Sequence, residues 1–378
     1  MKNVNVMLEI LFKGVQLRRW NGIYKAEEFV ETTKQGLNAA IAYVLAKIHE
    51  EQTGENVNYS TLIELSICRI VYKTIFTDIN PRISYRLLSE LKEEANDFAI
   101  KQVKELGFDE EFCNMFADYM ECKDKNDCVE LQIFHAASKL ATYWEFNQIK
   151  PGAGQNYLIQ RMERDIKTSM EYIKSLEAVK DYMLDEKINS FIDLYANTAY
   201  IKRWARFEMW PQISDLAHMY MTAVVSYIMM MENGISNKRC IEGFYAGLFH
   251  DTIEILTGDL PYTLKKEISG LKARLTEIEK AEYNNYIKPL LPAYLNKSIE
   301  KFVLMKVSER DRKIVKMSDN ISAYVEVVTS VLTGTTQDYF INIIERDWEE
   351  YKSCEVEGIP VKKVYEYFYD KYLEHQEK

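Results

Sequence analysis

The scarcity of helix-breaking residues constrains the fold of this chain more than any other feature. Only 14 glycines and 7 prolines occur among its 378 residues, which is about half of the usual share. β-Sandwiches and barrels need frequent turns, and those turns rely on glycine and proline. Apolar residues also recur at helical spacing along most of the chain. The sequence therefore predicts an all-α protein.

Charge and cysteine content narrow the function classes. The net charge is −10, so the chain has no long-range attraction for a phosphate backbone and no nucleic-acid partner is expected. The six cysteines form no C-x-x-C pair, and their irregular spacing indicates free thiols in a reducing compartment. No apolar run approaches the roughly 18 residues of a transmembrane helix. We therefore expect a cytoplasmic protein without a membrane partner.

Hydrophobic periodicity predicts most of the helices. Ser60 and Ser214 are each predicted to cap the start of one. The segment KPGAG at 150–154 is the clearest loop in the chain. The predicted helices cover residues 29–49, 60–76, 84–106, 139–148, 156–176, 185–194, 214–231, 238–249, 264–286, 310–332 and 361–373.

Two of the five histidines occupy informative positions. His218 lies in an apolar helix, and His250 is followed directly by Asp251 at the end of the next helix. With Asp319, further along the chain, they make a mixed nitrogen and oxygen ligand set that suits a divalent first-row metal and leaves positions for water and substrate. Each of these residues alone also fits ordinary packing or a solvated helix face. Their combination in one chain indicates a catalytic metal site.

The segment LFHDTIEILTGDLPYTLKK resembles the signature of the HD-domain phosphohydrolases. In particular it is similar to the bacterial HD-domain 5'-deoxynucleotidases, whose signature is HD-x-x-E-x-x-x-x-D-x-P-x-x-x-K. An Arg-Trp pair precedes the first metal histidine of that family by 15 residues, as Arg203 precedes His218 here, and Asp319 follows Asp251 by 68 residues. The resemblance covers about residues 200–332. One departure is Ala217, where the family usually has glutamate.

The resemblance implies a role for each matching residue. The metal ligands would be His218, His250, Asp251 and Asp319, holding one divalent transition metal (Mn, Co, Fe, Ni or Zn). Glu254 would transfer protons, and Arg203 would orient the substrate phosphate during catalysis. The alternative for Arg203 is a surface ion pair with Glu208. The remaining substrate-binding residues would be Trp204, Asp259, Leu260, Pro261, Tyr262 and Lys265.

The first half of the sequence resembles a decayed copy of the second. LRRWNG at 17–22 is similar to IKRWAR at 201–206. In this comparison Lys34 takes the place of His218, Thr77-Asp78 the place of His250-Asp251, and Ala141 the place of Asp319. Chance similarity between two helical bundles is the alternative. We expect two tandem HD-like bundles, a degenerate one at 1–190 and a catalytic one at 191–378.

The expected activity is that of a metal-dependent phosphohydrolase. The substrate implied by the resemblance is a small molecule, a nucleoside or deoxynucleoside 5'-monophosphate, and the products are nucleoside and phosphate. A nucleoside triphosphate hydrolase, a cyclic-nucleotide phosphodiesterase and a non-catalytic nucleotide-sensing module remain as alternatives. No G-Y-P element follows the His-Asp pair, which disfavours cyclic dinucleotides. Related bundles often pair, so a homodimer is left open.

Overall fold

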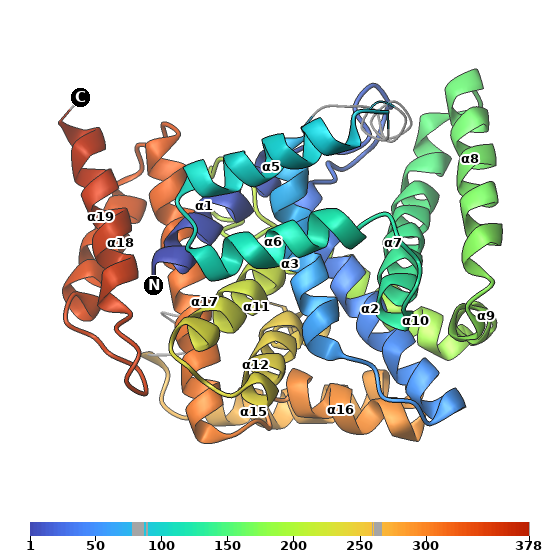
Figure 1. Ribbon diagram of the computed structural model, residues 1–378. Helices are drawn as coiled ribbons and strands as arrows, with labels where there is room; N and C mark the ends of the chain where they lie inside the picture. The colour runs from blue at the N-terminus through green and yellow to red at the C-terminus, as the bar shows by residue number, and fades with distance from the viewer. Residues whose placement is uncertain (78–86, 88–89, 259, 261–266, 378) are drawn as a thin grey trace.

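The computed structural model describes residues 1–77, 87, 90–258, 260 and 267–377 (Figure 1). Its elements are helices joined by short connections, and no strand occurs among these residues apart from isolated β-bridges. The prediction of an all-α protein is therefore confirmed.

The helices of the first half form one side of the fold and part of its centre. Helices α1, α2 and α3 lie centrally, whereas α7 to α10 stack on the right of Figure 1 and α5 and α6 cross its front. Their bounds are α1 Lys2–Gln16, α2 Glu31–Thr53, α3 Tyr59–Ile75, α5 Lys92–Leu106, α6 Glu110–Cys122, α7 Val129–Ala153, α8 Tyr157–Ile173, α9 Glu177–Leu184 and α10 Glu186–Ala196, followed by a 3-10 turn at Asn197–Tyr200.

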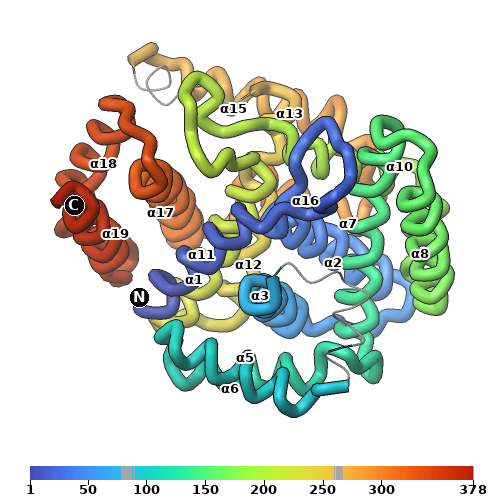
Figure 2. Tube along the Cα trace, turned by 90° about the horizontal axis from the view of Figure 1, so that it is seen from above, coloured from blue at the N-terminus to red at the C-terminus, as the bar shows by residue number. Residues whose placement is uncertain are grey.

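The second half supplies the rest of the centre and the opposite flank. Helices α11 and α12 lie beside α2 and α3, and α17 to α19 form the flank on the left of Figure 2. The bounds are α11 Asp215–Glu232, α12 Asn237–Phe249, α13 Glu254–Thr257, α15 Leu271–Glu282, a π turn at Tyr283–Ile287, a 3-10 turn at Lys288–Leu290, α16 Ala293–Val303, α17 Glu309–Leu332, α18 Asp338–Tyr351 and α19 Lys362–Gln376.

One hydrophobic core contains side chains from both halves of the chain. The ring of Tyr43 on α2 lies 4.4 Å from that of Tyr245 on α12, measured between centroids. Helices α2 and α11 approach each other closely at Gly36, where a Cβ would lie only 3.1 Å from the Leu216 carbonyl oxygen. The helices that begin the two halves' bundles are thus in direct contact.

The same backbone motif precedes α2 and α11, 184 residues apart. An isolated antiparallel bridge joins Arg18 to Val30 in the first half, and another joins Lys202 to Ser214 in the second. The tryptophan inside each loop has a left-handed backbone, with φ of 59° at Trp20 and 56° at Trp204. This conformation is uncommon for a bulky residue. Its occurrence at both matching positions supports an internal repeat.

Several predicted helix ends differ from the structure. The side chain of Ser214 caps α11 by accepting from the Ala217 amide, as predicted, but the cap of α3 is Asn58 rather than Ser60. The predicted loop at 150–154 is wrong because α7 continues to Ala153. Phe146 and Ile149 bury their side chains in a second, smaller core, and this packing extends the helix beyond its local preference.

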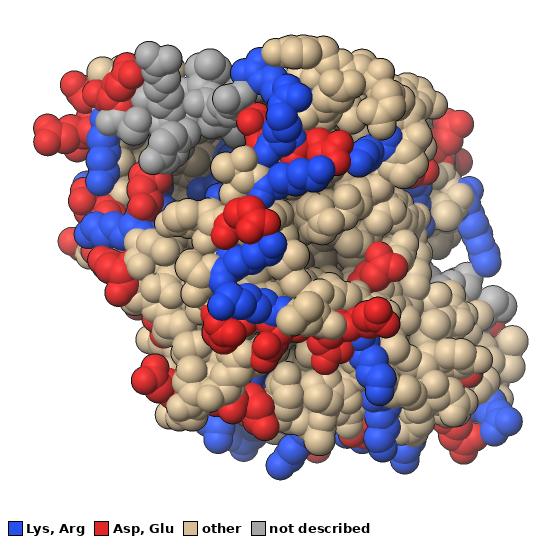
Figure 3. Space-filling view, turned by 90° about the vertical axis from the view of Figure 1, so that its right-hand side faces the viewer, with Lys and Arg blue, Asp and Glu red and all other residues tan. Residues whose placement is uncertain are grey.

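One face of the molecule carries acidic and basic side chains in close alternation. On the face turned to the viewer in Figure 3, red and blue side chains alternate across the tan surface, without a large area of one sign. Such a face has no strong field for steering a polyanion. Within the described part of the chain, none of the helices combines the length and the apolar character needed to cross a membrane.

Candidate metal centre

The four predicted metal ligands converge from three helices. His218 lies in the first turn of α11, His250 and Asp251 directly follow α12, and Asp319 lies on α17. One ligand atom from each of the first three residues lies within 4.8 Å of the others. The Asp319 Oδ1 atom is 2.9 Å from His218 Nε2 and 4.0 Å from His250 Nε2. The structure thus brings together all four side chains, including Asp319, which is distant in sequence.

The end of α12 allows His250 and Asp251 to face one point. The helix ends at Phe249 and His250 is its C-cap residue, so the chain leaves regular helical geometry at the next residues. Gly247 lets this end lie against α11, because a Cβ there would be 2.8 Å from backbone atoms of Ala223. The close approach of the two helices places the His250 ring centroid 5.7 Å from that of His218.

Hydrogen bonds orient both imidazoles in the same way. The Nδ1 atom of His218 donates to Glu326 Oε1 at 2.7 Å, and Nδ1 of His250 donates to the Gly247 carbonyl at 2.8 Å. Each ring therefore turns its Nε2 atom toward the cluster. Nε2 of His250 is buried and makes no hydrogen bond with any described residue. This arrangement, in which a ligating histidine donates its other N–H, is typical of metal sites and fits a bound cation.

The electrostatics of the cluster also suit a cation. Burial disfavours ionisation of Asp251, but the neighbouring His250 outweighs it and lowers the pKa of Asp251 to about 2. Burial likewise opposes ionisation of Asp319, and Lys316 and His218 bring its pKa well below the usual range. The pKa of His218 rises to about 9 because Glu326 and Asp319 outweigh burial and the repulsion of Arg203. The carboxylates are therefore charged at neutral pH.

Glu326 is a central residue of the site that sequence reasoning missed. Its side chain is fully buried, with 0% exposure, and it accepts hydrogen bonds from Arg203 Nε at 3.0 Å and Trp204 Nε1 at 2.8 Å in addition to His218. Burial raises the pKa of this carboxyl, but Arg203 and His218 outweigh that effect and lower it to about 2. The sequence signal that could have identified Glu326 is its spacing from Asp319, because residues seven apart lie two turns along the same face of a helix.

Arg203 and Trp204 lie beside the cluster, on the loop before α11. The side chain of Arg203 is only 12% exposed and pairs with Glu326, so the alternative of a surface pair with Glu208 is wrong. Burial opposes its charge, but carboxylates led by Glu326 and Asp319 raise the pKa of Arg203 above its ordinary value. The Trp204 ring lies edge-on to Phe340, with 5.8 Å between centroids.

The other predicted substrate residues are only partly covered by the structure. Glu254 begins α13, and its backbone N–H donates to the Asp251 carbonyl at 2.9 Å. This bond holds Glu254 next to the predicted ligand pair. Leu260 is half-buried. The predicted residues Asp259, Pro261, Tyr262 and Lys265 lie outside the described residues.

The first half repeats the surroundings of this site without its ligands. Arg19 and Trp20 both donate to Glu145, at 3.0 and 2.8 Å, as Arg203 and Trp204 do to Glu326. Lys34 donates to Ser138 Oγ at 2.5 Å. This bond corresponds to the contact between His218 and Asp319 in the second half. The prediction that Ala141 replaces Asp319 is therefore wrong by one helical turn. Thr77 is half-buried at the end of α3, and Asp78 lies outside the described residues.

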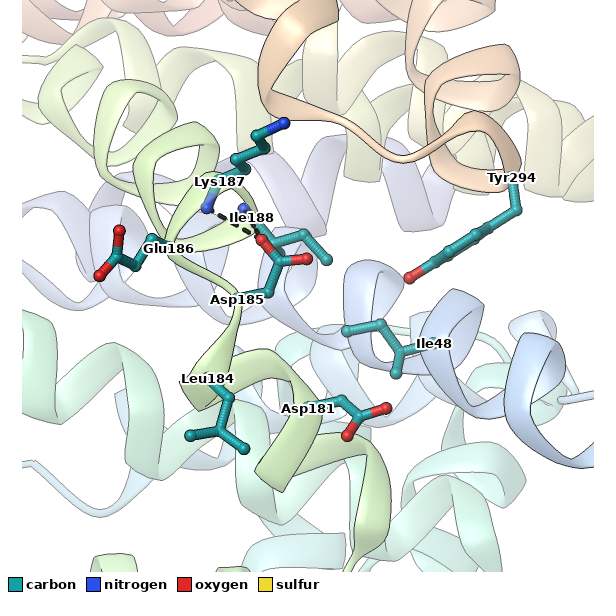
Figure 4. Close-up of a pocket in the computed structure, with 8 residues that line it drawn as sticks. All are labelled: Ile48, Asp181, Leu184, Asp185, Glu186, Lys187, Ile188 and Tyr294. Carbon is teal, nitrogen blue, oxygen red and sulfur yellow. Dashed lines mark hydrogen bonds between the residues drawn. The ribbon is translucent and has the colours of Figure 1, made fainter.

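A separate surface groove contains none of the predicted ligands. Its volume is about 570 Å³, and it lies between helices α2, α9, α10 and α16. Its lining combines apolar and aromatic side chains with charged ones, namely Ile48, Leu184, Ile188, Tyr294, Asp181, Asp185, Glu186 and Lys187. Figure 4 shows the Asp185 carboxylate accepting from the backbone amides of Lys187 and Ile188. Asp185 is thus engaged in capping α10.

Comparison with known proteins supports the resemblance of the second half to the 5'-deoxynucleotidases. Residues 190–375 match the family described as 5'-deoxynucleotidase YfbR-like. The C-terminal half of this chain is similar to the 5'-deoxynucleotidases of the HD-domain type. The family match covers both histidines, Asp251, Asp319 and Glu326. It begins close to the predicted boundary between the two halves.

Individual relatives agree with the family match, at low identity. A 5'-deoxynucleotidase of Vibrio vulnificus is 26% identical over 149 residues, which cover 36% of this chain and 75% of that protein. A 5'-deoxynucleotidase of Vibrio atlanticus is 24% identical over 174 residues, 42% of this chain and 87% of that protein. One from Pasteurella multocida is 26% identical over 163 residues, 40% and 79% of the two chains. Each similarity covers less than half of this chain.

Proposed function

We propose that the C-terminal half hydrolyses nucleoside or deoxynucleoside 5'-monophosphates and releases nucleoside and phosphate. The observation that carries this proposal is the convergence of two imidazole Nε2 atoms and two carboxylates beside a buried arginine. A cation site adjoining a guanidinium suits a substrate with a phosphate group. The names of the relatives supply the substrate class.

His218, His250, Asp251 and Asp319 would hold the divalent metal. Their nitrogen and oxygen donors suit the first-row ions Mn, Fe, Co, Ni and Zn. When bound, such an ion supplies Lewis-acid polarisation of the phosphoryl oxygen and a more acidic water. Glu326 keeps Nε2 of His218 facing the site by accepting from its Nδ1 atom.

Arg203 is placed to hold the phosphate. Its Nε atom is committed to Glu326, while NH1 lies 3.9 Å from Asp215. This anchoring fixes the guanidinium plane and leaves terminal N–H donors to bind phosphate oxygens. Glu254, beside Asp251, would transfer the proton that the leaving nucleoside oxygen needs. Trp204 would border the nucleotide, with Asp259, Leu260, Pro261, Tyr262 and Lys265 as the predicted remainder of the pocket.

We also propose that the chain is a tandem pair, with a catalytic unit at 191–378 and a non-catalytic unit at 1–190. The repeated loop before α2 and α11 supports this division. Lys34 and Ser138 are poor substitutes for a histidine and an aspartate as metal ligands, since a protonated amine has no lone pair to donate and a serine hydroxyl lacks the negative charge of a carboxylate. All six cysteines are free thiols, which supports a reducing, cytoplasmic environment.

Phosphate release from a nucleotide panel tests the proposed activity. The full-length protein would be stripped of metal, loaded with each divalent ion, and assayed on nucleoside mono-, di- and triphosphates and cyclic nucleotides. We expect metal-dependent release from 5'-monophosphates and none from Asp251→Ala. Preferred release from triphosphates or opening of cyclic nucleotides would favour those alternatives. Binding without turnover under every metal would favour the sensing module and contradict the proposal.

A further inference from the structure

The counterpart of the metal site in the first half contains a buried lysine. Lys34 on α2 is 3% exposed, and its Nζ atom makes one hydrogen bond to a described residue, with Ser138. An ammonium group has three donors, so two of them have no acceptor among the described residues. Burying a charged group without a full set of acceptors is costly.

Two more cations of the first half lie on the neighbouring helix α3, where the charge of Arg69 acts on Lys34 and the charge of Lys73 acts, like that of Lys34, on Glu31. Arg69 and Lys73 are one helical turn apart and share a face of α3. The Nε atom of Arg69 is buried and has no acceptor among the described residues, and its NH1 atom reaches Tyr119 Oη only at 3.4 Å. The described residues offer Lys73 neither a hydrogen bond nor an ion pair. Among the described residues, this end of α3 thus adds donors without acceptors to those of Lys34.

The local charges do not balance within the described residues. The two nearby carboxylates, Glu31 and Glu145, are both engaged by Arg19, at 2.8 and 2.9 Å. Together with Lys34, Arg69 and Lys73, Arg19 makes four cations against these two anions.

Burial and the excess of positive charge lower the pKa values of both lysines. Burial, with repulsion from Arg19 and Arg69, outweighs the attraction of Glu31 and lowers the pKa of Lys34 to about 7. Burial and Arg69 lower the pKa of Lys73 to about 8. An anion bound among these side chains would relieve the repulsion and keep both lysines charged.

We propose that Lys34, Arg69, Lys73 and Ser138 form a second, non-catalytic site that binds a phosphate group. Phosphate fits this set because it is a compact dianion with several acceptor oxygens, and ammonium, guanidinium and hydroxyl groups are its usual donors. Two of the replacements relative to the catalytic half, Lys34 for His218 and Ser138 for Asp319, exchange cation ligands for anion ligands. The phosphate group belongs either to inorganic phosphate or to a nucleotide.

Calorimetric titration of the full-length chain tests the proposal without interference from turnover. The parent protein would carry Asp251→Ala, which disables the C-terminal site, and would be titrated with inorganic phosphate and with a nucleoside 5'-monophosphate. We expect about one equivalent to bind and Lys34→Met to weaken binding tenfold to a hundredfold, the effect of losing one charge-assisted hydrogen bond. Lys73→Met, at a less buried position, tests the same site if Lys34→Met does not fold.

The matched control is Lys139→Met. This lysine is adjacent to Ser138 on α7, but its ammonium lies over the Tyr172 ring, 5.6 Å from the centroid. Binding should be unchanged in this variant. Nucleotide that binds at least tenfold more tightly than inorganic phosphate, with the same dependence on Lys34, would identify a nucleotide site, and equal affinities would identify a site for phosphate itself. Absence of binding to the parent, or equal binding by Lys34→Met and Lys73→Met, would overturn the proposal.

Discussion

Replacing Glu326 with glutamine should weaken metal binding although Glu326 is not one of the four predicted ligands. The carboxylate accepts from His218, Arg203 and Trp204 and is fully buried. Glutamine has nearly the same shape as glutamate, but its amide has only one acceptor oxygen. Its NH2 group would face side chains that are themselves donors. Loss of such a partner behind a ligating histidine typically costs about 10–100-fold in metal affinity or activity. Breaking the buried pair with Arg203 should also lower the free energy of unfolding by about 3–5 kcal/mol.

Glu145→Gln is the matched control for this variant. Glu145 binds Arg19 and Trp20 with the same geometry as Glu326 binds Arg203 and Trp204, but its neighbour is Lys34 rather than a predicted ligand. We expect a comparable loss of stability in denaturant unfolding and no loss of metal affinity.

The assay is a competitive titration of metal against a chelator, with phosphate release measured in parallel. Wild-type affinity in Glu326→Gln would refute the argument that Glu326 positions His218. Equal loss of metal in Glu145→Gln would also refute it, since the effect would then follow from general destabilisation.

Three further predictions follow from particular contacts. Arg203→Lys should lower kcat/KM roughly tenfold to a hundredfold, because an ammonium cannot both anchor to Glu326 and present a planar fork to phosphate, and one charged hydrogen bond contributes about 1.5–3 kcal/mol; steady-state kinetics with near-wild-type values would contradict this role. Gly247→Ala should lower the free energy of unfolding by about 1–3 kcal/mol, since its Cβ would lie 2.8 Å from the Ala223 backbone; an unchanged Tm would show that α12 has room to move. Lys34→Met should reduce the rise in stability between about pH 7 and 10.5 in phosphate-free buffer, because the unfolded chain keeps the Lys34 proton in that window while the folded chain releases it, and only the contribution of Lys73 should remain; unfolding curves with the same pH slope in both proteins would disagree with the lowered pKa of Lys34.

The sequence was sufficient to predict the all-α fold and the four side chains that converge. Sparse glycine and proline and strong periodicity identify long helices such as α11 and α17, and the family spacing selects Asp319 from many aspartates. These signals are local or fixed in number of residues. They do not depend on how α11 and α17 meet.

Other features depended on contacts between distant segments. The importance of Glu326 appears only when α17 brings it to His218 and the loop before α11 brings Arg203 to it. The alignment of Ala141 with Asp319 was one turn off because residues three apart share a helix face, and Ser138 is identified only by its bond to Lys34.

Metal content per chain tests the central claim most directly. The wild-type protein and Asp251→Ala would be loaded with the same divalent ion, desalted and analysed for metal by mass spectrometry, with circular dichroism to show that both are equally helical. We predict about one ion per wild-type chain, held by His218, His250, Asp251 and Asp319, and almost none in the variant. An equal metal content in two equally folded proteins would contradict the assigned site.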